Sequence, residues 1–177
     1  DKSHTITLAD DYLGSYIHSA VTSVATPSSS LSPSAHRVPL QKIWSDTSLT
    51  AADSGTTLVF QDTACVITLP DSGSGALLGV TYTFIAVGQG GTLEVKCVDD
   101  TNEKIIGALV VADTDDITSG GTFTAEAADN FSSVEFTGTT EGEPGSMFKL
   151  TCIDTDRWFI EGVILSAGTS ATPFATS

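Results

Sequence analysis

Positive charge is the scarcest feature of this sequence. Its 177 residues include 7 Lys and Arg against 22 Asp and Glu, which gives a formal net charge of −15. Nucleic-acid and anionic-lipid binding depend on Lys and Arg that neutralise phosphate, so a chain this acidic is a poor binder of either. We therefore expect no nucleic-acid partner, and we expect any charged partner to be basic or metallic.

Long apolar runs and paired cysteines are also missing. A long apolar stretch, residues 104–112 (KIIGALVVA), is far shorter than the roughly 20 residues that cross a bilayer, so we expect no membrane span. Cys65, Cys97 and Cys152 are widely spaced and odd in number, with no nearby histidine, which indicates neither a zinc site nor a disulfide framework. We interpret them as small buried side chains in a reducing compartment, with a Cys97–Cys152 bridge as the alternative.

Histidine is confined to the beginning of the chain, at His4, His18 and His36. A serine or cysteine nucleophile needs a base within hydrogen-bond reach, and the rest of the sequence offers no histidine for that role. Aromatic residues make up 7% of the chain, which leaves few rings for a sugar-binding platform beside paired carboxylates. We therefore predict that the protein is not an enzyme and has no catalytic residues and no cofactor.

Acidic clusters at residues 99–100 and 113–116 offer the hard oxygen ligands that calcium prefers. With Asp113 as the first ligand of an EF-hand loop, the required glycine would be Thr118 and the required glutamate would be Thr124. That pattern fails at both positions. We predict no metal site and interpret the clusters as solvated turns, with an irregular calcium loop as the alternative.

Residues 1–45 differ in composition from the rest of the chain. A Ser- and Pro-rich stretch at 26–34 (TPSSSLSPS) favours an extended arm, and apolar residues spaced by three and four between positions 12 and 24 favour one short helix. Such a helix is marginal without a partner surface, so we expect the arm to dock on another surface. At the other end, residues 166–177 are small and polar, and we interpret them as a tail.

Residues 46–165 alternate apolar and polar side chains with a period of two, which indicates half-buried strands. Gly- and Asp-rich segments separate these strands, and we interpret them as hairpin turns. The pattern predicts an all-β fold, an antiparallel, jelly-roll-like β-sandwich with an extended N-terminal arm. The predicted core residues are Phe84, Val95, Phe136, Leu150 and Trp158.

Six segments resemble a β-rich structural domain that is common in tailed phages, especially those of marine and cyanobacterial hosts. They are residues 49–60 (LTAADSGTTLVF), 66–70 (VITLP), 79–84 (GVTYTF), 129–136 (DNFSSVEF), 145–150 (GSMFKL) and 156–162 (DRWFIEG). The resemblance covers residues 49–162 and departs at Arg157, where a small polar residue is more usual.

Proteins of this type decorate or cement the capsid, so the resemblance implies a virion protein on the outer capsid surface. Its expected partners are the major capsid protein and further copies of itself, in a trimer. Similar domains also occur in tail and fibre proteins. The alternative function is therefore a phage appendage or a cell-surface adhesion module that recognises a host ligand.

We predict that the arm is the attachment element, because it offers apolar side chains without a core of its own. It is expected to lie along the major capsid protein or a neighbouring copy. The predicted partner-binding residues are Tyr12, Tyr16, Ile17, Val21, Val38, Leu40, Ile43 and Trp44.

Overall fold

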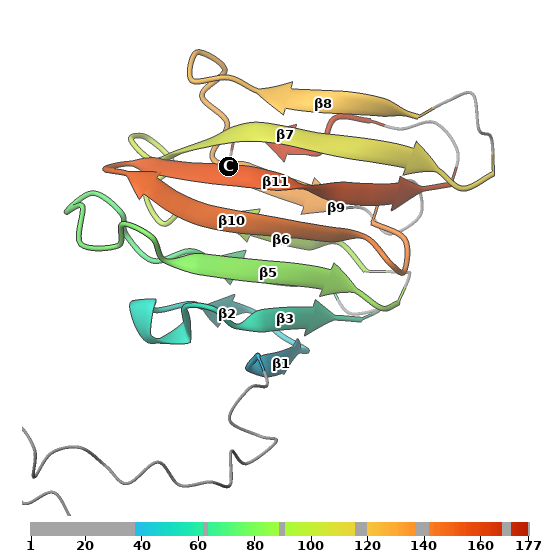
Figure 1. The fold of residues 1–177 in the computed structure, drawn as a ribbon, viewed down its shortest axis with the longest axis horizontal. Helices are drawn as coiled ribbons and strands as arrows, with labels where there is room; N and C mark the ends of the chain where they lie inside the picture. The colour runs from blue at the N-terminus through green and yellow to red at the C-terminus, as the bar shows by residue number, and fades with distance from the viewer. Residues whose placement is uncertain are drawn as a thin grey trace, which may run out of the picture. The chain divides into compact units, whose positions relative to one another are not determined.

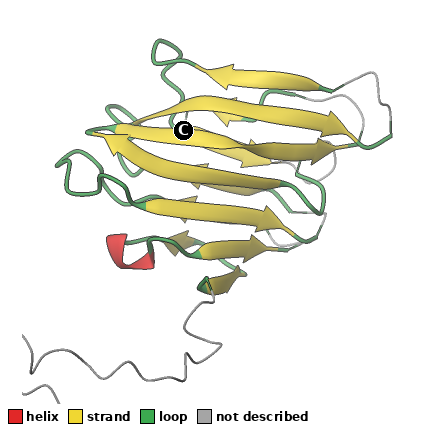
Figure 2. Cartoon of the chain, viewed as in Figure 1, coloured by secondary structure: helices red, strands yellow, loops and turns green. Residues whose placement is uncertain are grey.

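The computed structural model describes residues 38–61, 64–88, 91–115, 120–136, 142–167 and 171–176. Apart from a single 3₁₀ turn at Ala51–Asp53, the regular elements in these ranges are β-strands (Figure 2). The all-β fold class is therefore confirmed. The helix predicted between residues 12 and 24 lies outside the described residues. The strands are β1 (Leu40–Ile43), β2 (Thr47–Ser48), β3 (Thr57–Phe60), β4 (Cys65–Thr68), β5 (Thr81–Ala86), β6 (Leu93–Lys96), β7 (Lys104–Asp113), β8 (Gly121–Ala125), β9 (Ser133–Phe136), β10 (Met147–Asp154), β11 (Arg157–Ser166) and β12 (Phe174–Ala175).

The strands form two stacked sheets. Sheet A has seven strands in the order β1-β3-β5-β10-β11-β7-β8, and sheet B has five in the order β12-β9-β6-β4-β2. Sheet A lies toward the viewer in Figure 1, with sheet B behind it. Buried apolar side chains from both sheets make one cluster, which is the arrangement of a β-sandwich.

The pairing of the strands is mixed. The parallel pairs are β1–β3, β3–β5 and β7–β11 in sheet A, with β2–β4 and β4–β6 in sheet B. The other five described pairs are antiparallel. The predicted antiparallel, jelly-roll-like pairing thus holds for only half of them. From β1 to β6 the chain changes sheet at every connection, so each strand runs parallel to the previous strand of its own sheet.

Most of the predicted hairpin turns are crossings between the sheets. The connections that contain residues 119–121 and 154–156 do join antiparallel neighbours, β7 with β8 and β10 with β11. The connections that contain residues 71–75, 88–91, 99–102 and 141–145 instead lead from one sheet to the other, so the hairpin interpretation is wrong for them. Glycine and aspartate favour a reversal of chain direction, but they do not determine which sheet the next strand joins.

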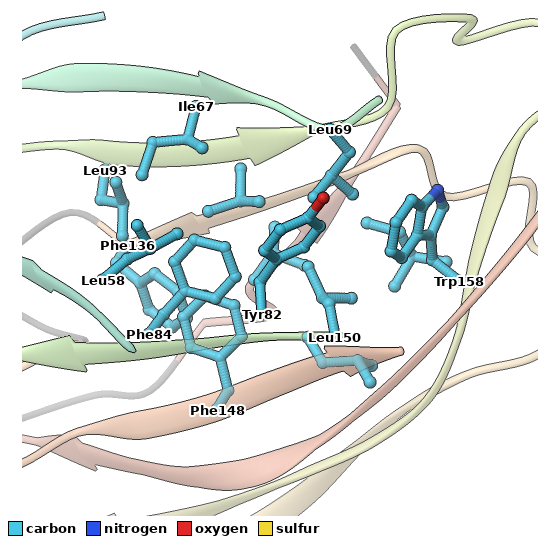
Figure 3. Packing of buried hydrophobic residues seen from close by; sticks show 14 of the residues in the cluster. Leu58, Ile67, Leu69, Tyr82, Phe84, Leu93, Phe136, Phe148, Leu150 and Trp158 are labelled. Atoms are coloured by element: carbon cyan, nitrogen blue, oxygen red, sulfur yellow. The ribbon is translucent and has the colours of Figure 1, made fainter. Parts of the chain in front are cut away.

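The five predicted core residues all belong to the buried cluster, so that prediction is confirmed. Figure 3 shows their aromatic centre, where the Phe84 and Phe148 rings stack at 4.7 Å and Phe136 of sheet B lies 5.0 Å from Phe148. The Tyr82 hydroxyl donates a hydrogen bond to the Thr50 carbonyl oxygen at 2.7 Å. Burial raises the pKa of Tyr82 to about 12.

The predicted segment boundaries need correction at both ends. Strand β1 lies inside the segment that we assigned to the arm, and the compact unit begins at Val38. Strand β12 lies inside the predicted tail, where it pairs with β9 and buries Phe174 in the core. Strand β1 does not alternate, since three exposed residues precede Ile43, and the two residues of β12 are too few to show a period.

Two glycines allow the central strands of sheet A to approach closely. Gly107 of β7 has a φ of 134°, and an added Cβ there would collide with the carbonyl oxygen of Ile160 on β11. An added Cβ at Gly162 of β11 would lie 2.5 Å from the Cα of Phe148 on β10. A side chain is therefore excluded at each of these two positions, where the neighbouring strands approach closely.

Candidate partner-binding surface

The predicted partner-binding residues divide into three groups. Val38, Leu40 and Trp44 are 62%, 64% and 54% exposed, which leaves them accessible to a partner. Ile43 is only 3% exposed and belongs to the core cluster, so its assignment to a partner contact is wrong. The cause is strand parity, because Ile43 points inward where Leu40 and Lys42 point outward. The remaining four residues, Tyr12, Tyr16, Ile17 and Val21, lie outside the described residues.

Strand β1 is an edge of sheet A in the described part of the chain, where it pairs with β3 alone. The Pro39 carbonyl oxygen accepts a hydrogen bond from the Thr57 amide at 2.8 Å, so in a parallel ladder the backbone groups of Leu40 and Lys42 point to the open edge. The Lys42 ammonium lies 5.8 Å from the centre of the Trp44 ring. A lysine and a preceding proline are typical of edges that resist uncontrolled strand addition.

The outward side of sheet A, which we call face A, carries a continuous row of apolar side chains. Cα-paired residues on neighbouring strands project to the same side of a sheet, so the register identifies its members. This apolar row crosses five adjacent strands, and consists of Val59, Ile85, Met147, Val163 and Val110.

Much of the apolar row is accessible. Met147, Val163 and Val110 are 48%, 43% and 48% exposed, and Phe159, also outward on β11, is 37% exposed. Val59 lies outside the core cluster, as expected for a side chain on the side of the sheet opposite the core. It is nevertheless buried. A contiguous exposed apolar surface on a folded domain is characteristic of an interaction site.

Face A was not predicted from the sequence, although β7 contained a signal for it. Its apolar run is too short for a membrane span, but Ile105, Leu109 and Val111 point into the core while Ile106 and Val110 point outward. Strands that are apolar on both sides are typical of sheets covered on both faces. The run could therefore have predicted that face A meets another surface.

The outward side of sheet B, which we call face B, has different chemistry. Glu94 of β6 and Glu135 of β9 are directly opposite each other, with Val66 of β4 beside Glu94. The next row contains Thr68, Lys96 and Ser133. Ser133 is buried and the other members of these two rows are half-buried, so face B is mainly polar but is not fully exposed to solvent. Like charges directly opposite each other across two strands are destabilising, and Glu94 and Glu135 form such a pair.

The acidic loops are organised by internal hydrogen bonds. The buried Glu103 carboxylate accepts bonds from the Ser72 amide at 2.6 Å, the Ser72 hydroxyl at 2.5 Å and the Asp99 amide at 3.0 Å. Hydrogen bonds from the Asn102 side chain and from nearby backbone amides lower the pKa of Asp99. Glu103 therefore fastens the loop before β5 to the loop before β7.

The acidic loops also offer candidate ligands for a metal ion. Among the described residues, no group of three or more His, Cys, Asp or Glu side chains is arranged to hold a metal ion. The alternative calcium loop at 113–116 includes Asp116, which lies outside the described residues. Asp113 accepts a hydrogen bond from the Asp115 amide at 3.0 Å.

All three cysteines are free and buried, so the interpretation as small buried side chains is confirmed and the Cys97–Cys152 bridge is not formed. Burial raises the pKa of each thiol, which keeps it protonated and unreactive at neutral pH. Their role in the structure is to fill space in the core.

Comparison of the chain with protein-family models, with curated proteins and with solved structures found no match. In the part of the chain that the structure describes, no helix has the length and hydrophobicity needed to cross a membrane.

Proposed function

We propose that this protein is a structural component of a phage virion that decorates or cements the outer capsid surface by binding the major capsid protein. The sequence resemblance supports the class of protein. The observation that carries the proposal is the exposure of Val38, Leu40 and Trp44, which lie in and beside the edge strand β1. These three residues belong to the predicted attachment element, and we propose that they continue its contact with the capsid.

The chemistry of this edge suits a protein partner. Tryptophan is enriched among the residues that dominate binding energies at protein interfaces. The Lys42 ammonium lies 5.8 Å from the centre of the Trp44 ring, a cation–π contact that favours this arrangement of the two side chains. A preorganised anchor loses less entropy when it binds, which supports a stable attachment.

Reconstitution on naked capsids tests this proposal. The full-length protein should co-sediment with capsids in copy numbers comparable with those of the major capsid protein, as measured by mass spectrometry. Trp44→Ala should weaken this binding, because the substitution removes the exposed anchor. Val98→Ala is the matched control, since Val98 is also an exposed apolar residue but lies in a loop after β6. Failure to bind, or a few copies confined to one vertex or to the tail, would favour the appendage function instead.

Removal of the arm tests the attachment element itself. Because β1 begins at Leu40, the truncation should remove residues 1–37 and leave sheet A intact. The truncated protein should keep a cooperative unfolding transition and lose capsid binding. Undiminished binding would assign attachment to the sandwich rather than to the arm.

A further inference from the structure

We propose that face A is the contact between copies of this chain, so that the apolar rows of neighbouring protomers pack together in a closed homo-oligomer. It is centred on β10, β11 and β7, whereas the proposed capsid contact lies at the β1 edge of the same sheet, and neither proposal depends on the other. The expected trimer satisfies the proposal if the three faces surround a common axis, and a two-fold dimer satisfies it equally.

Most of face A is left uncovered by the described residues, although its composition is that of a buried surface. Residues 106, 108, 110 and 112 of β7 are Ile, Ala, Val and Ala at successive outward positions. On β11, Phe159, Val163 and Leu165 share this side of the sheet. Figure 1 shows no described strand or helix in front of these strands. The apolar side chains therefore gain burial only when another molecule or segment covers them.

Face A also carries few acidic residues. In the apolar row and the registered row beside it, the charged residues are Lys42, Lys149 and Glu161. The chain as a whole has 22 carboxylates against 7 cations, so this surface is depleted in acidic residues. It is where two copies of an acidic chain can meet without placing carboxylate against carboxylate.

The ion pair at the centre of face A also suits a second copy. Lys149 and Glu161 are directly opposite on β10 and β11, with 3.5 Å between their charged atoms. Both are partly exposed, so their charges remain available to a partner. A second copy presents the same pair, and each Lys149 can then meet the other protomer's Glu161. In a two-fold dimer this contact is reciprocal, whereas in a cyclic trimer each Lys149 would meet the Glu161 of the next protomer around the ring.

Sedimentation velocity of the full-length protein across a range of concentrations tests the proposal. The protein should sediment as a closed oligomer, and added salt should strengthen association, because it screens repulsion between copies of net charge −15. The double variant Val110→Thr and Val163→Thr should raise the dissociation constant by about tenfold or more, since each hydroxyl becomes buried without a partner. Val66→Thr makes the same change on face B and should leave association unchanged.

Circular dichroism and cooperative unfolding must show that each variant keeps its sheets. If the double variant unfolds, Met147→Gln replaces it, because this substitution adds polarity at similar length in the same row. A protein that is monomeric at every concentration overturns the proposal, whether residues 1–37 or a capsid protein covers face A. An oligomer that is insensitive to both variants overturns it as well. A monomer that still decorates capsids would overturn the face A contact and leave the proposed function standing. An oligomer that does not bind capsids would overturn the proposed function and leave the face A contact standing.

Discussion

Face A of the sandwich presents an apolar row across five neighbouring strands, whereas face B places Glu94 directly opposite Glu135. Both faces belong to the same folded unit and are supported by one core. A sheet that needs only to remain soluble can tolerate the repulsion on face B. The apolar row is unfavourable in an isolated protomer, because exposed apolar area favours aggregation unless a partner covers it. The proposed contact across face A accounts for this difference.

The largest expected effect concerns how sheet A is held together. Its strands contain Gly107 and Gly162 at close crossings, whereas the strands of sheet B contain no glycine in the described residues. Gly107→Ala combines backbone strain with a collision against Ile160, so we expect it to lower the free energy of unfolding by about 3–6 kcal/mol. Gly121→Ala is the control, since open space surrounds that position. Equal denaturation midpoints for the two variants would contradict the close approach of β7 and β11.

The next effect separates the two sides of a single strand. Trp158 and Phe159 are neighbours on β11, but Trp158 is buried in the core while Phe159 lies on face A. Trp158→Ala should cost about 3–5 kcal/mol in urea unfolding, the range for deleting a buried aromatic side chain. Phe159→Ala should cost about 1 kcal/mol or less when measured on dissociated protomers. Similar losses in the two variants would show that face A is part of the folding core.

Titration of Tyr82 gives a pH-dependent effect that belongs to the core rather than to either face. Its pKa is raised in the folded protein to about 12 from about 10, so the unfolded state loses its proton first. The stability contributed by the protonated side chain is complete below pH 10 and is lost as the pH rises toward 12. Tyr82→Phe should lose about 1 kcal/mol at neutral pH with the bond to Thr50, and its stability should fall less between pH 10 and 12. If the stability of the Tyr82→Phe variant falls as steeply with pH as that of the unmodified protein, the raised pKa of Tyr82 is not the cause of the loss.

The smallest effects are opposite in sign on the two faces. Glu135→Gln removes a like-charge pair on face B and should raise stability by about 0.2–1 kcal/mol. Glu161→Gln removes the partner of Lys149 on face A and should lower stability by about 0.5 kcal/mol or less, because both groups are well exposed. Both changes should shrink in 1 M salt, which screens exposed charges. Chemical unfolding at low and high salt provides the measurement, and changes of the same sign would contradict the contrast between the faces.

The sequence contained enough information to predict the sandwich and its core. Alternation in β5, β6 and β10 placed residues such as Phe84, Val95 and Leu150 correctly on the inner side. The direction of pairing could not be predicted in the same way, because alternation is identical in parallel and antiparallel strands. The four residues of β1 do not alternate in this way, because the polar Gln41 shares the inward parity of Ile43, so the pattern did not show that Ile43 points inward. Face A could not be predicted without knowing which strands are neighbours, because its apolar row is assembled from five separate segments of the sequence.

Oxidation of Met147 provides the most direct test of the claim that face A is a contact surface. It is the single methionine of the chain, and it is 48% exposed in the middle of the apolar row. Methionine sulfoxide forms at sites that an oxidant can reach, so a contact across face A should protect this residue. With a fixed peroxide concentration, the account predicts that sulfoxide formation at Met147 slows as the protein concentration rises through the association range. A rate that does not change with protein concentration would contradict it.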